Sequence, residues 1–266
     1  MAPFPPAAGP GPGPSRTGRA VAAWRAGFPR PWSPDGDPDA QAALCAGMLP
    51  PRRVPLRAHL EARTRFFDDQ VVAAIGRGTG QVVVLGAGYD DRALRFRTAG
   101  VRFFEVDHPG TQSDKRRRLG RMGWDGSGPT LVPADFRVDD VGAALARVGH
   151  RAGRPTLVLA EGLLVYLDGA TVVGLLSAVH ARAAEGSTLV ASLAVHPDGA
   201  DSEQVLVRAN AARPGPAHEP WRTVLSVPAH LELVSRSGWT VAESVDDAAL
   251  GTGAVPGRSL LVVARP

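Results

Sequence analysis

Four short apolar runs in the middle of the chain each end at a glycine or an acidic residue, and this pattern constrains the fold most. The first run, QVVVL at 81–85, leads directly into Gly86-Ala87-Gly88. A β-branched run of this length, apolar at consecutive positions, is typical of a parallel strand buried on both faces. The next three runs, at 101–106, 130–133 and 155–160, are expected to lie beside it in one sheet.

Helical patterns alternate with these runs. Apolar residues at helical spacing predict helices at 17–28, 39–48, 57–76, 92–98, 111–121, 138–148, 168–184 and 228–237. Three further strands are expected at 187–195, 239–245 and 259–264. A chain that alternates strand and helix forms a mostly parallel sheet with helices on both faces. We therefore predict an α/β fold built on a seven-stranded sheet.

The chain is expected to fold as a single domain behind a disordered leader. Residues 1–16 are rich in proline and glycine and carry too little apolar surface to fold. Residues 17–266 form the domain, in which 17–78 make an N-terminal helical cap and about 196–228 a loop-rich substrate cover. With 44% hydrophobic residues, a domain of this length can bury a substantial core.

Composition removes several classes of protein. A single cysteine excludes an internal disulfide or a cysteine-based zinc site. Since no apolar run reaches the roughly 18–20 residues of a membrane span and no signal peptide is evident, we expect a cytoplasmic protein without a membrane partner. Of 30 basic residues 29 are arginine, a bias typical of G+C-rich genomes, and the net charge is only +4. The dense run Lys115–Arg118 fits a solvated helix face, so no nucleic-acid partner is expected.

The residues that follow the four strands form one constellation. Gly86 and Gly88 follow the first strand, Asp107 the second, Asp135 the third and Glu161 the fourth. In open α/β sheets, ligands bind beyond the carboxyl ends of the strands. The two glycines allow a tight turn and a close approach of a ligand to the backbone. The sequence therefore predicts a ligand site at this edge.

Each acid has a chemical role and a structural alternative. Asp107, 21 residues after Gly86, can accept hydrogen bonds from a ribose diol, or it can cap the next helix. Asp135-Phe136 would place an acceptor and an apolar surface beside an adenine ring, although Asp135 also suits a turn. Glu161 interrupts an apolar stretch, where a carboxylate costs several kcal/mol unless it is paired. It could face the amino group of a methionine-like tail or order the pocket.

The turn distinguishes between two nucleotide-type cofactors. The dinucleotide fingerprint G-x-G-x-x-G requires a third glycine and places a pyrophosphate at the helix N-terminus. Here Asp91 occupies that position and Asp90 precedes it. Two carboxylates would repel a pyrophosphate, whereas a cationic sulfonium suits them, so the residues favour S-adenosylmethionine. A NAD-type oxidoreductase and a non-catalytic cofactor-binding module remain the alternatives.

Four segments together resemble a known family. VVVLGAGYDDRALRF (82–96), FFEVDHPGTQSDKRRRL (103–119), Ala134-Asp135-Phe136 and LAEGLLVYL (159–167) resemble the leucine carboxyl methyltransferase family. The likeness is to its bacterial branch of S-adenosyl-L-methionine-dependent methyltransferases and covers roughly 17–266. It implies a Rossmann-like class I methyltransferase fold, S-adenosyl-L-methionine as cofactor, and transfer of its methyl group to oxygen.

The resemblance also implies roles for individual residues. Gly86 and Gly88 would approach the cofactor, and Asp107 would hold its ribose. Asp135 and Phe136 would flank adenine, and Glu161 would lie near the methionine end. Arg63, in ARTRFFDD, would pair with the cofactor carboxylate, with a further basic residue expected near Arg19 or Arg25. The family's pattern also places a lysine where this chain has Lys115, and Glu219-Pro220-Trp221 resembles the region over the pocket.

The acceptor is expected to be a small molecule that offers a carboxylate or a hydroxyl group, such as a polyketide-like metabolite. Tyr166 is a candidate for orienting that acceptor. A carboxylate needs no base, whereas a hydroxyl needs one. His108 and His196 follow the second and fifth strands, but we interpret them as a helix-start residue and a loop residue. The sequence thus assigns no catalytic base, no metal site and no oligomeric state.

Overall fold

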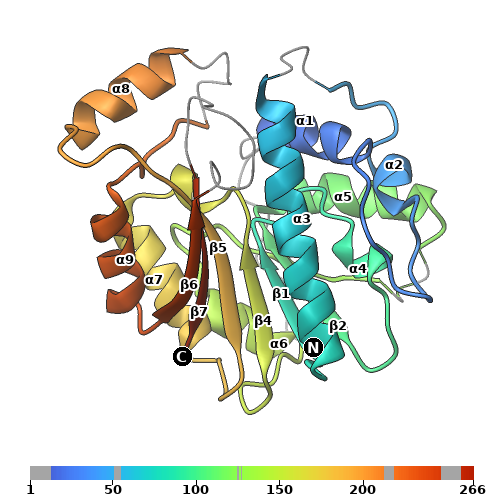
Figure 1. The fold of residues 1–266 in the computed structure, drawn as a ribbon. Coiled ribbons are helices and arrows are strands. Elements are labelled where there is room, and N and C mark those ends of the chain that lie inside the picture. The colour runs from blue at the N-terminus through green and yellow to red at the C-terminus, as the bar shows by residue number, and fades with distance from the viewer. Residues whose placement is uncertain (1–12, 51–54, 125, 127, 213–218, 247–258) are drawn as a thin grey trace.

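A computed structural model describes residues 13–50, 55–124, 126, 128–212, 219–246 and 259–266. Most of the predicted leader lies in 1–12, outside the described residues. Within the described residues, seven strands form one sheet in the order β3-β2-β1-β4-β5-β7-β6 (Figure 1). Their bounds are β1 Gln81–Leu85, β2 Arg102–Asp107, β3 Thr130–Pro133, β4 Thr156–Ala160, β5 Thr188–Ala194, β6 Thr240–Asp246 and β7 Ser259–Arg265.

The sheet is parallel from β3 to β5, and β7 enters antiparallel between β5 and β6. This confirms the predicted α/β fold with a mostly parallel, seven-stranded sheet. In the register, Leu85 lies opposite Val106, and Asp107 opposite Pro133. The carboxyl ends of the strands therefore meet at one edge. The strand order reverses between β1 and β4, which is where open α/β sheets bind ligands.

Helices cover both faces of the sheet because alternate strand residues point to opposite sides. Val83 and Phe104 belong to the core cluster under α6, α7 and α9, whereas Val82 belongs to the cluster under α3 and α4. The bounds are α3 Pro55–Gly76, α4 Arg92–Arg95, α6 Val141–Arg147, α7 Gly169–His180 and α9 Val227–Arg236. Every residue of β1 and β4 is buried, as the apolar runs predict.

The N-terminal helices pack in a smaller cluster. Helices α1 (Arg16–Arg25), α2 (Ala40–Leu44) and α5 (Pro109–Arg121) contribute Ala22, Leu44 and Leu119 to it. In Figure 1, α1 lies at the end of the sheet to which the parallel strands point. The N-terminal segment thus covers the edge at which the ligand site is predicted.

Two helical segments lie where no helical pattern is seen in the sequence. The predicted loop-rich cover contains α8 (Ser202–Ala212), because the side chain of Asp201 accepts hydrogen bonds from the N–H groups of Glu203 and Gln204 and so starts a helix. A 3-10 turn, η1 (Leu164–Tyr166), follows β4. The helix expected at 138–148 begins only at Val141, since Asp140 caps it through the N–H of Ala143.

Candidate active site

The glycine turn after β1 has the backbone that the sequence predicts. Gly86 and Gly88 have φ of 63° and 51°, in the left-handed region that favours glycine. A Cβ on Gly86 would lie 2.8 Å from Leu163 Cδ1, whereas a Cβ on Gly88 would meet nothing nearer than Gly18 Cα at 3.9 Å. Gly86 is therefore required for packing, whereas a Cβ on Gly88 would make only ordinary contacts.

Asp107, at the end of β2, is bound to that turn. Its Oδ2 accepts a hydrogen bond from the Gly88 N–H at 2.6 Å, and its Oδ1 accepts one from the His108 N–H at 2.7 Å. Burial raises the pKa of Asp107, although these two hydrogen bonds and the charge of Lys115 oppose the rise. Each oxygen keeps a lone pair beyond these bonds, which a ligand hydroxyl can use.

Asp135 and Phe136 follow β3, but Asp135 is already paired. Its carboxylate accepts from Arg137 Nε at 2.9 Å and from Arg137 Nη2 at 2.7 Å. These hydrogen bonds lower the pKa of Asp135. Phe136 is half-buried and packs against the core cluster of the sheet. The structure thus places both residues at the carboxyl edge, with Asp135 engaged by its own neighbour.

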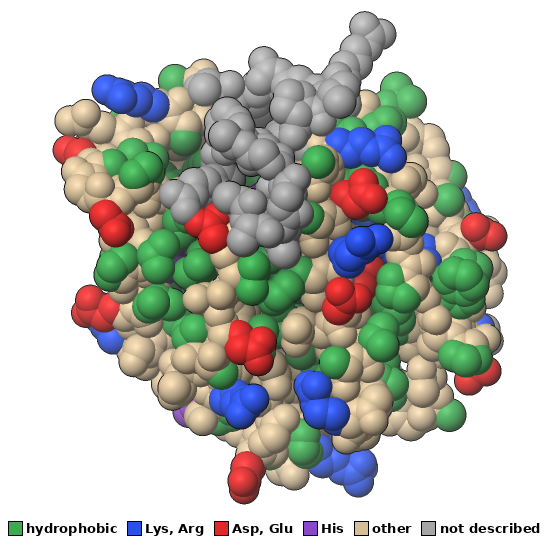
Figure 2. Space-filling view, viewed as in Figure 1, with side chains coloured by type: hydrophobic (Ala, Val, Ile, Leu, Met, Phe, Trp, Pro, Cys, Tyr) green, Lys and Arg blue, Asp and Glu red, His purple; other side chains and the backbone are tan. Residues whose placement is uncertain are grey.

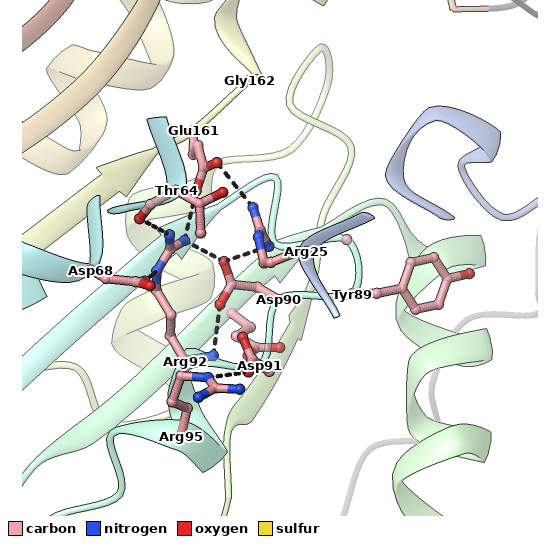
Figure 3. Close-up of polar contacts among 12 residues, drawn as sticks. Arg25, Thr64, Asp68, Tyr89, Asp90, Asp91, Arg92, Arg95, Glu161 and Gly162 are labelled. Carbon is pink, nitrogen blue, oxygen red and sulfur yellow. Dashed lines mark hydrogen bonds and ion pairs between the residues drawn. The ribbon is translucent and has the colours of Figure 1, made fainter. Parts of the chain in front are cut away.

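Glu161, after β4, is the centre of a buried group of arginines (Figure 3). Its Oε1 accepts from Arg25 Nη2 at 3.0 Å and from Arg63 Nε at 3.1 Å, and its Oε2 accepts from Arg92 Nη1 at 2.7 Å. Burial alone would raise the pKa of Glu161, but the charges of the three arginines outweigh it and hold that pKa well below its usual range. The pairing expected of a carboxylate in this apolar stretch is confirmed.

The ion pairs continue into the interior. Arg92 also binds Asp68 and Asp90, both at 2.6–2.7 Å. Arg30 joins Asp68 to Asp91. Arg95 also pairs with Asp91. Burial alone would raise the pKa of Asp91, but the charges of Arg30 and Arg95 outweigh it and lower that pKa to about 2. We call these nine residues the arginine network: Arg25, Arg30, Arg63, Asp68, Asp90, Asp91, Arg92, Arg95 and Glu161.

This geometry corrects one argument from the sequence. Asp90 and Asp91 were expected to repel a pyrophosphate at the turn, but their carboxylates lie within the arginine network and are neutralised there. They contribute little negative charge to the ligand side of the turn. The preference for a cofactor without phosphates therefore has to rest on other residues.

The arginine network carries one more positive than negative charge. Five guanidinium groups meet four carboxylates, and none of the nine side chains is more than 11% exposed. The buried Nε of Arg25 has no hydrogen-bond partner among the described residues, and Arg63 uses only its Nε toward them. Because buried charge is costly without a partner, this end of the network is suited to an anionic group such as a carboxylate.

Tyr166 and the two candidate histidines lie around the same edge but have structural contacts. Tyr166 is half-buried in η1, and the backbone N–H of Arg222 donates to the neighbouring Val165 carbonyl at 2.7 Å. His108 caps α5 by accepting from the Gly110 N–H through Nδ1. His196 contacts Pro197 and Ser202 at the start of α8. The interpretation of His108 as a helix-start residue is confirmed.

Four residues of the arginine network were not singled out from the sequence: Arg30, Asp68, Arg92 and Arg95. The three arginines among them were hidden because arginine is so abundant in this chain. Of the two alternatives for a further basic residue, Arg25 pairs with Glu161, whereas Arg19 pairs with Asp114. The available signal was the sequence DDRALR at 90–95, where acids and arginines alternate inside an otherwise apolar region.

The strand order defines a Rossmann-like α/β fold. The solved structure of a "putative methyltransferase" from Thermobifida fusca YX shares this fold, with a TM-score of 0.62 over 95% of each chain at 19% identity. The family model described as leucine carboxyl methyltransferase matches residues 32–180. The chain belongs to the leucine carboxyl methyltransferase family.

Curated relatives agree with this membership. One from Mycolicibacterium gilvum (strain PYR-GCK), named "Putative S-adenosyl-L-methionine-dependent methyltransferase", is 39% identical over 158 residues, which are 59% of this chain and 47% of the relative. Another of the same description, from Streptomyces avermitilis, is 38% identical over 201 residues, 70% of this chain and 68% of the relative. The chain spans about half the length of most of the curated relatives it matches.

Among the described residues, none of the helices is both long and apolar enough to cross a bilayer. Nor does that part of the chain hold a group of three or more His, Cys, Asp or Glu side chains that could bind a metal ion. On the face shown in Figure 2, basic side chains are separated from one another and interspersed with acidic ones.

Proposed function

We propose that this protein is an S-adenosyl-L-methionine-dependent methyltransferase that methylates an oxygen atom, carboxylate or hydroxyl, of a small molecule such as a polyketide-like metabolite. One observation carries the cofactor assignment. The arginine network has one more positive than negative charge, and its unused donors belong to Arg25 and Arg63, near the glycine turn that follows β1. A ligand with a carboxylate at one end and a ribose at the other fits these groups.

Different residues of the candidate site would bind different parts of the cofactor. Arg63, whose Nη atoms make no hydrogen bond to described residues, and Arg25 would bind the carboxylate of the methionine part. Glu161 holds both arginines in place and offers negative charge to the amino group. Asp107 would accept from the ribose hydroxyls. Asp135 and Phe136, at the end of β3, would flank the adenine.

When bound, S-adenosylmethionine supplies an electrophilic methyl group on its sulfonium, and transfer to an acceptor oxygen releases S-adenosylhomocysteine. The chain's contribution is to align the two reactants, which is worth up to about 7–11 kcal/mol in the best cases. Tyr166, beside the backbone of 222–223, would orient the acceptor from η1. A carboxylate acceptor requires no proton transfer, whereas a hydroxyl must give its proton to a base.

Calorimetry tests the cofactor, and a labelled-methyl assay tests the acceptor. Titration of the whole chain with S-adenosylhomocysteine is expected to show binding in the micromolar range. The absence of any binding of S-adenosylhomocysteine and S-adenosylmethionine would overturn the proposal. Incubation of the protein and labelled S-adenosylmethionine with a host metabolite extract is expected to label a small molecule. Label found only in a protein would contradict the proposed acceptor class.

A further inference from the structure

Lys115, the single lysine of the chain, lies inside the protein rather than on a solvated helix face. Its side chain is 1% exposed, and its Nζ donates to the carboxylate of Glu105, which is itself fully buried. The same Nζ donates to the backbone carbonyl of Asp90 at 2.6 Å. One ammonium group therefore connects α5, β2 and the turn that follows β1.

The carbonyl of Asp90 belongs to the turn that forms the proposed cofactor site. The Asp90 N–H donates to the Ala87 carbonyl at 2.8 Å and closes the turn. Within that turn, Gly88 donates its N–H to Asp107. The backbone on both sides of the Asp90 Cα is therefore held by hydrogen bonds, and through the turn it is connected to Gly88 and to the carboxylate that would hold the ribose. Gln41 also holds this turn by donating to the Tyr89 carbonyl at 2.9 Å.

The contacts explain why a lysine stands here in a chain that otherwise uses arginine. An ammonium is a compact donor that can serve a carboxylate oxygen and a carbonyl at once. A guanidinium is larger and carries five N–H donors in a fixed plane. At this fully buried position the described contacts offer only Glu105 and the Asp90 carbonyl as acceptors. An arginine would have to displace its neighbours and would leave donors without partners.

We propose that Lys115 is a positioning residue for the cofactor site: its ammonium, held by Glu105, fixes the Asp90 carbonyl and with it the turn that presents Gly88 and Asp107. This inference rests on the proposed function, because it concerns the same site. It goes beyond that function in assigning a role to a side chain whose described contacts are with Glu105 and the Asp90 carbonyl.

A purely structural ion pair would give a different result from a positioning contact. Lys115→Met leaves the Glu105 carboxylate buried without a cation, which destabilises the fold by itself. The double variant Glu105→Leu with Lys115→Met replaces the pair by apolar side chains, an exchange that is often neutral for stability. It restores the charge balance but not the donor to Asp90. Stability should therefore recover in the double variant, whereas the position of the turn should not.

The first readout is binding of S-adenosylhomocysteine by the full chain. We expect the double variant to melt at a higher temperature than Lys115→Met, and both to bind S-adenosylhomocysteine about ten-fold more weakly than the unmodified protein, the effect of one lost hydrogen bond. Lys115→Arg, which keeps the charge, should also bind more weakly. Arg117→Met, on the exposed side of the same helix, is the matched control and should bind normally. Unchanged affinity in the double variant would overturn the inference.

The second readout needs no ligand. Hydrogen exchange of the amides at 86–91 should be faster in the double variant than in the unmodified protein, while exchange in α7, on the far face of the sheet, should be unchanged. Normal exchange at 86–91 would also overturn the inference. If the unmodified protein failed to bind S-adenosylhomocysteine, the proposed function would be wrong, but faster exchange at the turn would still support the role of Lys115.

Discussion

Glu219 accepts a hydrogen bond from the backbone N–H of Thr17 at 3.1 Å, although 202 residues separate the two in the sequence. The same Oε2 also accepts from the Thr17 hydroxyl. Thr17 lies in the first turn of α1, where backbone N–H groups have no partner within the helix. The segment that was predicted to cover the substrate thus supplies a carboxylate to the N-terminus of α1, the helix that carries Arg25.

Glu219→Ala is expected to lower the free energy of unfolding by about 1 kcal/mol, the usual effect of losing a cap at a helix N-terminus. Urea unfolding followed by circular dichroism measures this change. The control is Glu232→Ala, on the exposed side of α9, which should leave the unfolding midpoint unaltered. Equal midpoints for the two variants would show that the contact with Thr17 contributes nothing.

Gly86→Ala and Gly88→Ala should differ although both glycines have positive φ. Each substitution carries a backbone cost of about 1–3 kcal/mol. Gly86→Ala adds a clash with Leu163, so it should destabilise more, and Leu163→Ala in the same chain should recover part of the loss. Gly88→Ala fits sterically and should act mainly on the affinity for S-adenosylhomocysteine. Thermal melting and calorimetry on both variants check this, and identical effects would contradict it.

Arg92→Met is expected to destabilise the protein by about 3–5 kcal/mol, because it leaves buried carboxylates without their cation. The three partners are Asp68, Asp90 and Glu161, and the Arg92 side chain has no solvent exposure. Chemical denaturation gives the value. Arg137→Met, which breaks an exposed pair, should cost less than about 1 kcal/mol. A small effect of Arg92→Met would mean that the network relaxes without its central arginine.

The stability of the protein should fall as the pH is lowered from about 6.5 to about 4, partly through His150. Burial, together with Arg182 and Arg102, lowers the pKa of His150 to about 4. Its Nδ1 accepts from Arg182, so the folded protein holds the ring neutral while the unfolded chain takes up a proton at a higher pH. Melting temperatures across this range should fall less steeply for His150→Gln. A slope equal to that of the unmodified protein would count against this role.

Asp107→Ala is expected to weaken the binding of S-adenosylhomocysteine by about 1–3 kcal/mol, the range for a lost partner of a polar group. The backbone N–H groups of Gly88 and His108 would also lose the carboxylate that accepts their hydrogen bonds. The turn would therefore be held less firmly. Calorimetry compares this variant with Asp198→Ala, which changes an exposed acid of a loop. Unchanged affinity would show that Asp107 does not bind the ribose.

The sequence was a good guide to the sheet and to the residues at its carboxyl edge. Apolar runs bounded by glycine or acid are local signals, and they placed β1 and β4 within one residue of their observed bounds. The pairing of Glu161 could be inferred because its apolar neighbours make an unpaired carboxylate costly. Its partners could not, since Arg25 and Arg63 lie 136 and 98 residues away and only the folded chain brings them together.

The abundance of arginine in the chain concealed other residues of the candidate site. With 29 arginines in the chain, Arg30, Arg92 and Arg95 did not stand out, yet all three are buried in the arginine network. The directions of side chains could not be inferred from the sequence either. Asp90 and Asp91 looked like ligand-facing acids on the basis of spacing alone, whereas both point into the protein. The capping contacts of Asp201, which start α8, also depend on a local turn that periodicity does not report.

Because Lys115 is buried, the rate at which its side chain reacts with a reagent reports local opening of the protein. Reagents that acylate amines modify an exposed lysine quickly, and this chain offers them a single lysine side chain, which is 1% exposed. Acylation of that side chain can proceed only when α5 separates from β2 or the structure opens further. The rate of labelling at Lys115 therefore measures how often the interior around the glycine turn becomes accessible to solvent, without any engineered probe.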